Sequence, residues 1–200
     1  MPRNRQPLSR ELKRALKKLP AREKDRLLLR LLPTNPDLVR KLEFKLLEDS
    51  ATQERRAALH ETIAAQAREF VHRYASPTYL LRDYRTVSTE ITRHRKATRD
   101  KLGEVELTLL LFNATLPELV EELSAPIPDL GKTLHKYVIQ RTVKLLKLLT
   151  VLSPEERLTQ QPALIELGEV MSEIPNLREA ASRLNFDINW LLSGEWPTEL

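Results

Sequence analysis

Glycine is nearly absent from this chain of 200 residues, and its scarcity constrains the fold more than any other feature of the sequence. The four glycines are Gly103, Gly131, Gly168 and Gly194. Tight hairpins and ligand-binding loops rely on glycine because it adopts backbone conformations that other residues avoid. Leucine, a strong helix former, dominates the apolar residues, whereas aromatic residues make up 5% of the chain. We therefore predict an all-α protein without a β-sheet, folded as an irregular multi-helix bundle or a short helical array.

Proline and small polar capping residues divide the first part of the chain. Short helices are predicted over residues 9–19, over residues 20–33 and after Pro36, the third with a stripe of Leu38, Leu42 and Leu46. Ser50 and Gln53 have the spacing of a capping pair, which predicts that a separate, longer helix starts there and ends near Tyr74. The first three helices resemble, loosely, the helical hairpins of HEAT-like solenoids.

For the rest of the chain, long helices are predicted over residues 79–102 and 130–152, and shorter ones over residues 104–113 and 117–123. A further helix begins at the capping box of Ser153 and Glu156, and breaks are expected at Pro175 and Pro197. We predict one domain over residues 1–200. A subdivision at Ser76-Pro77, into a basic short-helix part (1–75) and a long-helix bundle (77–200), is the alternative.

The two halves of the chain have charges of opposite sign. Residues 1–101 contain 25 Lys or Arg and 13 Asp or Glu, a net charge of +12, whereas residues 102–200 contain 8 and 15, a net charge of −7. Such an asymmetry suits a surface that docks an acidic partner, two halves that attract each other, or helix faces that are only solvated. The sequence leaves these three interpretations open.

The stretch ITRHRKATRDK, residues 91–101, has the highest density of positive charge near the middle of the chain. On a helix that turns about 100° per residue, an apolar stripe forms from Leu80, Tyr84, Val87, Ile91, Thr98 and Leu102. The opposite face carries Arg82, Arg85, Arg93 and Lys96. These cations either bind an anionic partner by ion pairing or form the solvated face that every amphipathic helix needs.

His94 and Arg95 flank the apolar stripe, where a leucine would pack more simply. A half-buried arginine needs an acidic partner or a bound anion. We expect a salt bridge from Arg95 to Glu104 or Glu106, with His94 as a packing residue, and keep an anion site as the alternative. The candidate residues for binding an anion or a partner are therefore Arg82, Arg85, Arg93, Arg95 and Lys96.

Motifs for metal and nucleotide chemistry are incomplete. HETIA at His60 starts like the zinc motif His-Glu-x-x-His, but Ala64 stands where the second histidine belongs. Gly131-Lys132-Thr133 matches the end of a phosphate-binding P-loop, but the glycine needed five residues earlier is Pro126. The chain has no cysteine, which excludes thiolate metal sites and fits a reducing compartment. We expect no catalytic residue, no cofactor and no metal.

The run EITRHRKATRDKLGEVELTLLLFN, residues 90–113, resembles uncharacterised all-helical proteins of Bacteroidetes-type bacteria. That resemblance implies a bacterial cytoplasmic protein and implies no activity. The longest uncharged apolar stretch, LTLLLFNATLP, has eleven residues, whereas a membrane span needs about 20, so we expect no membrane insertion.

These observations favour a non-catalytic cytoplasmic helical binding or scaffold protein that uses its basic N-terminal half to contact an acidic partner, with a protein as the expected partner. Binding of RNA or DNA is the alternative. It draws support from Tyr74, Tyr79 and Tyr84, which lie among arginines and could stack on unpaired bases.

Overall fold

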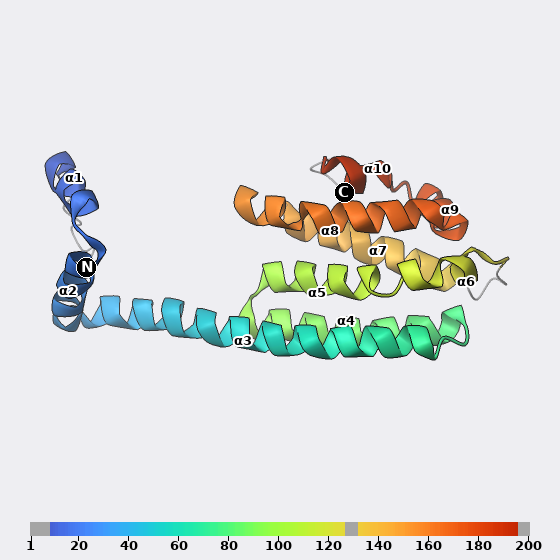
Figure 1. Cartoon of the computed structure of the whole chain (residues 1–200), viewed down its shortest axis with the longest axis horizontal. Coiled ribbons are helices and arrows are strands. Elements are labelled where there is room, and N and C mark those ends of the chain that lie inside the picture. The colour runs from blue at the N-terminus through green and yellow to red at the C-terminus, as the bar shows by residue number, and fades with distance from the viewer. Residues whose placement is uncertain (1–8, 127–131, 196–200) are drawn as a thin grey trace, which may run out of the picture. The chain divides into compact units, whose positions relative to one another are not determined.

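The computed structural model describes residues 9–126 and 132–195, apart from the side chains of residues 15–16, 37–38 and 40–50 (Figure 1). Within these residues the regular structure is entirely helical, which confirms the all-α prediction. The longer helices are α1 (Arg10–Lys18), α2 (Ala21–Leu31), α3 (Pro36–His72), α4 (Pro77–Thr98), α5 (Lys101–Asn113), α7 (Lys132–Leu149), α8 (Pro154–Glu173) and α9 (Pro175–Arg183). Shorter helical segments are η1 (Leu32–Thr34), η2 (Pro117–Leu119), α6 (Val120–Ser124) and α10 (Asn189–Ser193). None of the described helices is long and apolar enough to cross a membrane.

The chain forms two compact units, Met1–Ala51 and Thr52–Leu200. In the first unit, Ser9 caps α1 by accepting a hydrogen bond from the backbone N–H of Leu12 at 3.2 Å. Helix α2 follows directly after Pro20 and leaves Leu28 and Leu29 exposed. The predicted stripe of Leu38, Leu42 and Leu46 lies outside the described side chains.

Helix α3 is continuous through Ser50, so the prediction of a new helix starting there is wrong. The third short helix and the first long helix of the sequence analysis are one element. No proline or glycine occurs between Pro36 and Pro77, and nothing therefore interrupts the ladder of backbone hydrogen bonds. A serine with a glutamine three residues later can cap the start of a helix, but the same two residues can also lie inside a helix that continues through them.

The boundary between α4 and α5 lies earlier in the chain than the sequence predicted. Helix α4 ends at Thr98 rather than near residue 102, because Arg99 adopts the left-handed conformation, with φ of 60°. Asp100 then caps α5 by accepting a hydrogen bond from the backbone N–H of Gly103 at 2.8 Å. Gly103 therefore lies in the first turn of α5 rather than in a connection.

Helix α5 is the centre of the second unit and contacts α4, α7 and α8 (Figure 1). One apolar core joins it to these helices and to Ile63 and Phe70 of α3. Tyr84 of α4 is fully buried and shares a hydrogen bond of 2.5 Å with Thr115. Burial raises the pKa of Tyr84, and the hydroxyl therefore stays protonated.

The start of α8 follows the predicted cap, whereas α7 ends at Leu149 rather than at residue 152. Both hydrogen bonds of the predicted capping box at the start of α8 are present, from Glu156 N to Ser153 Oγ at 3.2 Å and from Ser153 N to Glu156 Oε2 at 2.8 Å. Helix α9 begins at Pro175, where the sequence indicated a break. The remaining expected break, at Pro197, lies outside the described residues.

Candidate anion-binding groove

A partly buried ionic cluster surrounds the junction of α4 and α5. Arg56 of α3 holds Asp100 through two hydrogen bonds of 2.8 Å, from Nε to Oδ2 and from Nη2 to Oδ1. Its Nη1 donates to Oε2 of Glu106 at 2.9 Å. Burial by itself would lower the pKa of Arg56, but the hydrogen bonds and negative charges of these two carboxylates outweigh burial and raise the pKa.

Glu104 is a second centre of this cluster and is 1% exposed. Lys144 Nζ lies 2.6 Å from Oε1, and Arg95 Nε lies 2.5 Å from Oε2. The contact of Arg95 is an ion pair that lacks the alignment of a hydrogen bond. The expected salt bridge from Arg95 to Glu104 is thus present. His94 packs beside it with a nearly buried side chain and its Nε2 3.3 Å from Asp100 Oδ2.

A different set of cations lines a groove between α4 and α7, which has a volume of about 560 Å³. The groove is lined by Arg85, Ser88, Thr89, Thr92, Arg93 and Lys96 of α4 and by Tyr137 and Arg141 of α7. Every one of these side chains carries either a positive charge or a hydroxyl group, and no described carboxylate lines the groove. We call this feature the α4–α7 groove.

The three cations that α4 contributes to the groove are exposed and have no carboxylate within 4.0 Å among the described residues. Arg85 lies beside Tyr137, with its guanidinium carbon 5.9 Å from the centre of the ring. Tyr137 is held in turn by its hydroxyl, which donates to the carbonyl oxygen of Tyr84 at 3.4 Å. Arg93 and Lys96 lie about two and three turns further along the same face of α4.

The structure separates the five predicted binding residues into three that line the groove and two that do not. Arg85, Arg93 and Lys96 come together in the α4–α7 groove. Arg82 does not line it: the guanidinium carbon of Arg82 lies 5.0 Å from the ring centre of Tyr79, and its Nε lies 3.8 Å from Asp83 Oδ1. Arg95 does not line it either, because it faces Glu104.

Ser88, Tyr137 and Arg141 line the groove but were not among the predicted binding residues. Ser88 had a detectable signal, since it is a polar residue on the side of α4 that buries Tyr84 and Ile91. Arg141 lies among buried residues of α7 and had a similar but weaker signal. No pattern in the sequence indicated that α7 would lie across from α4.

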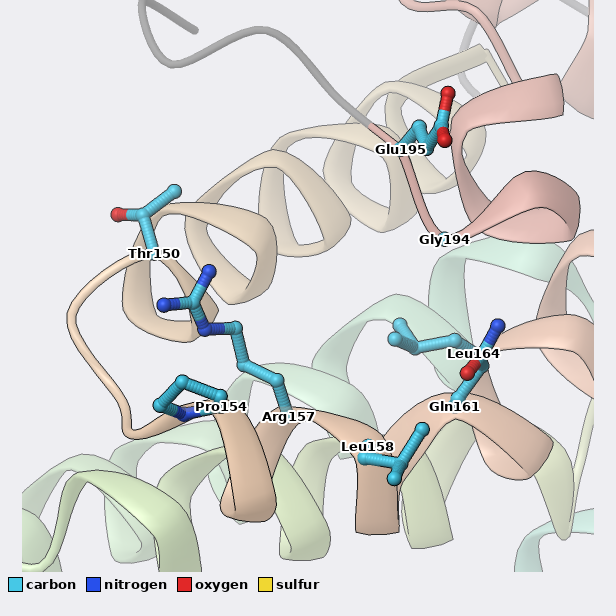
Figure 2. Close-up of a pocket in the computed structure, with 8 residues that line it drawn as sticks. All are labelled: Thr150, Pro154, Arg157, Leu158, Gln161, Leu164, Gly194 and Glu195. Carbon is cyan, nitrogen blue, oxygen red and sulfur yellow. The ribbon is translucent and has the colours of Figure 1, made fainter.

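Two other hollows carry groups of both charges. Figure 2 shows one of about 520 Å³, lined at one end by Thr150, Pro154 and Arg157 and at the other by Gly194 and Glu195. Arg157 Nε already donates to the carbonyl oxygen of Leu152 at 3.2 Å. The second hollow, between α7 and α9, contains the ion pair of Arg183 and Glu179. Neither gathers unpaired cations as the α4–α7 groove does.

The described residues contain no group of three or more His, Asp or Glu side chains placed to hold a metal ion. Comparison of the chain with protein families, curated proteins and solved structures gave no match. The resemblances to HEAT-like hairpins and to helical proteins of Bacteroidetes-type bacteria therefore stay predictions.

Proposed function

We propose that this chain is a non-catalytic cytoplasmic binding protein that holds an acidic segment of a protein partner in the α4–α7 groove. The observation that carries the proposal is the gathering of Arg85, Arg93, Lys96 and Arg141 around one groove that no described carboxylate lines. Cations with an existing carboxylate partner would have to give it up before binding. The three on α4 have none within 4.0 Å among the described residues, and they therefore meet a partner's carboxylates without that cost.

The grouping of the cations favours a short acidic segment over a nucleic-acid backbone. A nucleic acid presents a phosphate at every nucleotide and suits a positive groove that follows the strand. Beyond Arg85 on α4, the charge of Arg82 is partly balanced by Asp83, whose Oδ1 lies 3.8 Å from Arg82 Nε. A cluster of acidic side chains needs matching charge at one place only, and the groove provides it.

Binding of a labelled peptide to the full chain tests the proposal. The probe is an unstructured peptide with four consecutive glutamates, used at about 0.15 M salt, where screening acts over about 8 Å. We expect the triple variant R85Q/R93Q/K96Q to bind about tenfold more weakly, since each exposed ion pair contributes about 0.2–1 kcal/mol. Glutamine is a good helix former, so α4 should remain intact.

The matched control is the triple variant R68Q/K147Q/R178Q. It removes the same charge from exposed residues that do not line the groove. We expect this variant to bind the peptide as the parent chain does. An equal loss of affinity in both triple variants would mean general attraction to a basic protein and would contradict the proposal, as would a failure of the parent chain to bind the peptide.

Nucleic-acid binding is the second candidate function because one tyrosine–arginine pair is exposed on α4. Tyr79 is 54% exposed, and the guanidinium of Arg82 lies 5.0 Å from its ring centre, an arrangement that suits stacking on an unpaired base. A uridine-rich RNA oligomer provides the corresponding arm of the experiment. Four phosphate contacts on a single strand would give a logarithmic salt dependence of roughly −3. Binding of the oligomer without binding of the peptide would favour this candidate.

A further inference from the structure

Ser88 is an unusual residue for its place at the floor of the α4–α7 groove. It is 5% exposed, and its Oγ has no hydrogen-bond partner among the described residues. Hydroxyl side chains within helices often bond to the carbonyl four residues back, as Thr89 does with Arg85 at 2.8 Å. A buried polar group without a partner costs about 1–3 kcal/mol. The hydroxyl of Ser88 is thus available to a ligand, and no hydrogen bond within the described residues requires it.

Arg141 at the same floor carries a positive charge that its surroundings do not neutralise. Its side chain is 13% exposed, and its Nη2 lies 3.9 Å from Glu104 Oε1. Glu104 is already held more closely by Lys144 and Arg95, at 2.6 and 2.5 Å. The Nε of Arg141 has no hydrogen-bond partner among the described residues. Three cations therefore surround one carboxylate, and the surplus charge lies next to the groove.

The ligand that satisfies these groups has more charge and more acceptor oxygens than a carboxylate. A phosphate monoester carries about −1.5 to −2 charges near neutral pH and three strong acceptor oxygens, whereas a carboxylate carries one charge and two oxygens. Donors reach the groove from two helices, Ser88 from α4 and Arg141 from α7, with the exposed cations of α4 at the rim. The guanidinium of arginine forms two parallel hydrogen bonds with phosphate, which fixes its orientation.

We propose that the α4–α7 groove recognises a phosphate monoester, carried by a phosphorylated side chain of the partner protein, in preference to glutamate or aspartate. Ser88 and Arg141 hold the phosphate oxygens at the floor, and Arg85, Arg93 and Lys96 surround them at the rim. This inference rests on the proposed function, because it specifies which acidic group the same groove takes.

The experiment uses three peptides that differ at one central residue, which is serine, glutamate or phosphoserine. Affinities for the full chain are measured by titration calorimetry, with inorganic phosphate alone as a fourth ligand. We expect the phosphoserine peptide to bind at least about tenfold more tightly than the glutamate peptide. Inorganic phosphate should compete with the phosphoserine peptide, because the same oxygens occupy the floor of the groove.

Two conservative variants test the floor of the groove. S88A removes the hydroxyl, and R141K keeps the charge while removing the guanidinium fork. We expect each to reduce the preference for phosphoserine over glutamate by about fivefold or more. S172A is the matched control, because Ser172 donates to the carbonyl of Gly168 at 2.8 Å and does not line the groove.

A thermal unfolding scan of S88A separates a binding role from a structural role. Since Ser88 has no hydrogen bond to lose and alanine is the better helix former, S88A should be at least as stable as the parent chain. A clear loss of stability would mean that Ser88 supports the fold, and would overturn its assignment to the ligand.

The outcomes distinguish this inference from the proposed function. Equal affinities for the phosphoserine and glutamate peptides, both weakened by R85Q/R93Q/K96Q, would overturn the phosphate inference and leave the proposed function standing. Binding of neither peptide would overturn both. A phosphoserine preference that survives in S88A and R141K would show that Ser88 and Arg141 do not form the phosphate site.

Discussion

Asp100 uses one carboxylate to hold two parts of the molecule. Its Oδ1 accepts the backbone N–H of Gly103 at the start of α5, and its two oxygens bind Arg56 of α3. The carboxylate side chain is 5% exposed, whereas that of Arg56 is 22% exposed. An ion pair of this kind is costly to break from one side, because the remaining charge stays partly buried without its partner.

Asp100→Asn should therefore destabilise the protein markedly. Loss of one member of a buried ion pair costs about 3–5 kcal/mol, and we expect a decrease of about 3 kcal/mol in the free energy of unfolding, since Arg56 retains some contact with solvent. Urea denaturation followed by circular dichroism measures the change. Glu106→Gln is the control, and it should cost about 1 kcal/mol or less because that carboxylate is 32% exposed. Equal losses in the two variants would contradict this account.

Glu156 gives the capping box of α8 a dependence on pH. Its hydrogen bonds with the backbone and side chain of Ser153 lower the pKa of Glu156 below the ordinary value of 4.5. A carboxyl group whose pKa is lower in the folded protein stabilises the fold above the unfolded pKa, and this contribution is lost as the pH falls through the folded pKa. Glu156→Gln should remove this component, so that the free energy of unfolding falls less steeply below pH 4.5 in the variant than in the parent chain. Parallel slopes in urea titrations of both proteins would refute the role of Glu156.

At the scale of elements, the junction of α4 and α5 contains a residue in a strained backbone conformation. Arg99 has φ of 60°, a region that costs residues other than glycine roughly 1–2 kcal/mol. Its backbone N–H donates to the carbonyl oxygen of Arg95 at 2.7 Å and so closes the last turn of α4. Glycine is the usual residue at this position after a helix.

Arg99→Gly should stabilise the protein by about 0.5–1 kcal/mol, because relief of the left-handed strain exceeds the greater entropy that glycine has in the unfolded chain. Thermal or urea unfolding measures the gain. Arg99→Ala is the matched control, since it removes the same side chain and keeps the strain, and it should not stabilise the protein. If the alanine variant gained as much as the glycine variant, the effect would come from the lost charge instead of from the backbone.

At the scale of the whole molecule, the groove, the ionic cluster and the described apolar core all belong to one of the two compact units. The buried apolar residues run from Ile63 to Leu191, and each of them lies within Thr52–Leu200. Arg56 and every residue that lines the α4–α7 groove lie in this unit as well. Removal of residues 1–51 therefore takes away none of these groups.

A fragment of residues 52–200 should fold by itself. We expect a helical circular dichroism spectrum, one cooperative unfolding transition, and the affinity of the full chain for the acidic peptide. Calorimetry and the peptide titration check the three expectations. Loss of the cooperative transition would mean that residues 1–51 contribute to the stability of this unit.

The features that the sequence determined by itself are those that depend on residues a few positions apart. Leucine periodicity and the scarcity of glycine were sufficient for the all-α fold, and the pattern of α4 was sufficient for its buried stripe from Leu80 to Ile91 and for its exposed basic face. The last two residues of the predicted stripe, Thr98 and Leu102, are half-buried, and Leu102 lies in α5. The capping box of Ser153 and Glu156 formed because its two hydrogen bonds join residues three apart. The same local logic was wrong at Ser50, where continuation of α3 prevailed over a cap of similar appearance.

Only the tertiary structure decided which cations share a site. Arg93 and Arg95 are two residues apart in the same basic run, yet Arg93 lines the groove between α4 and α7, whereas Arg95 faces Glu104 of α5. Tyr137 contacts the carbonyl of Tyr84 across 53 residues of chain. Contacts between residues so far apart in the sequence arise from the packing of apolar faces, and that packing does not depend on the polar residues beside those faces. The positive charge on this side of α4 could therefore be predicted from the sequence, whereas the set of residues that line the groove depended on the fold.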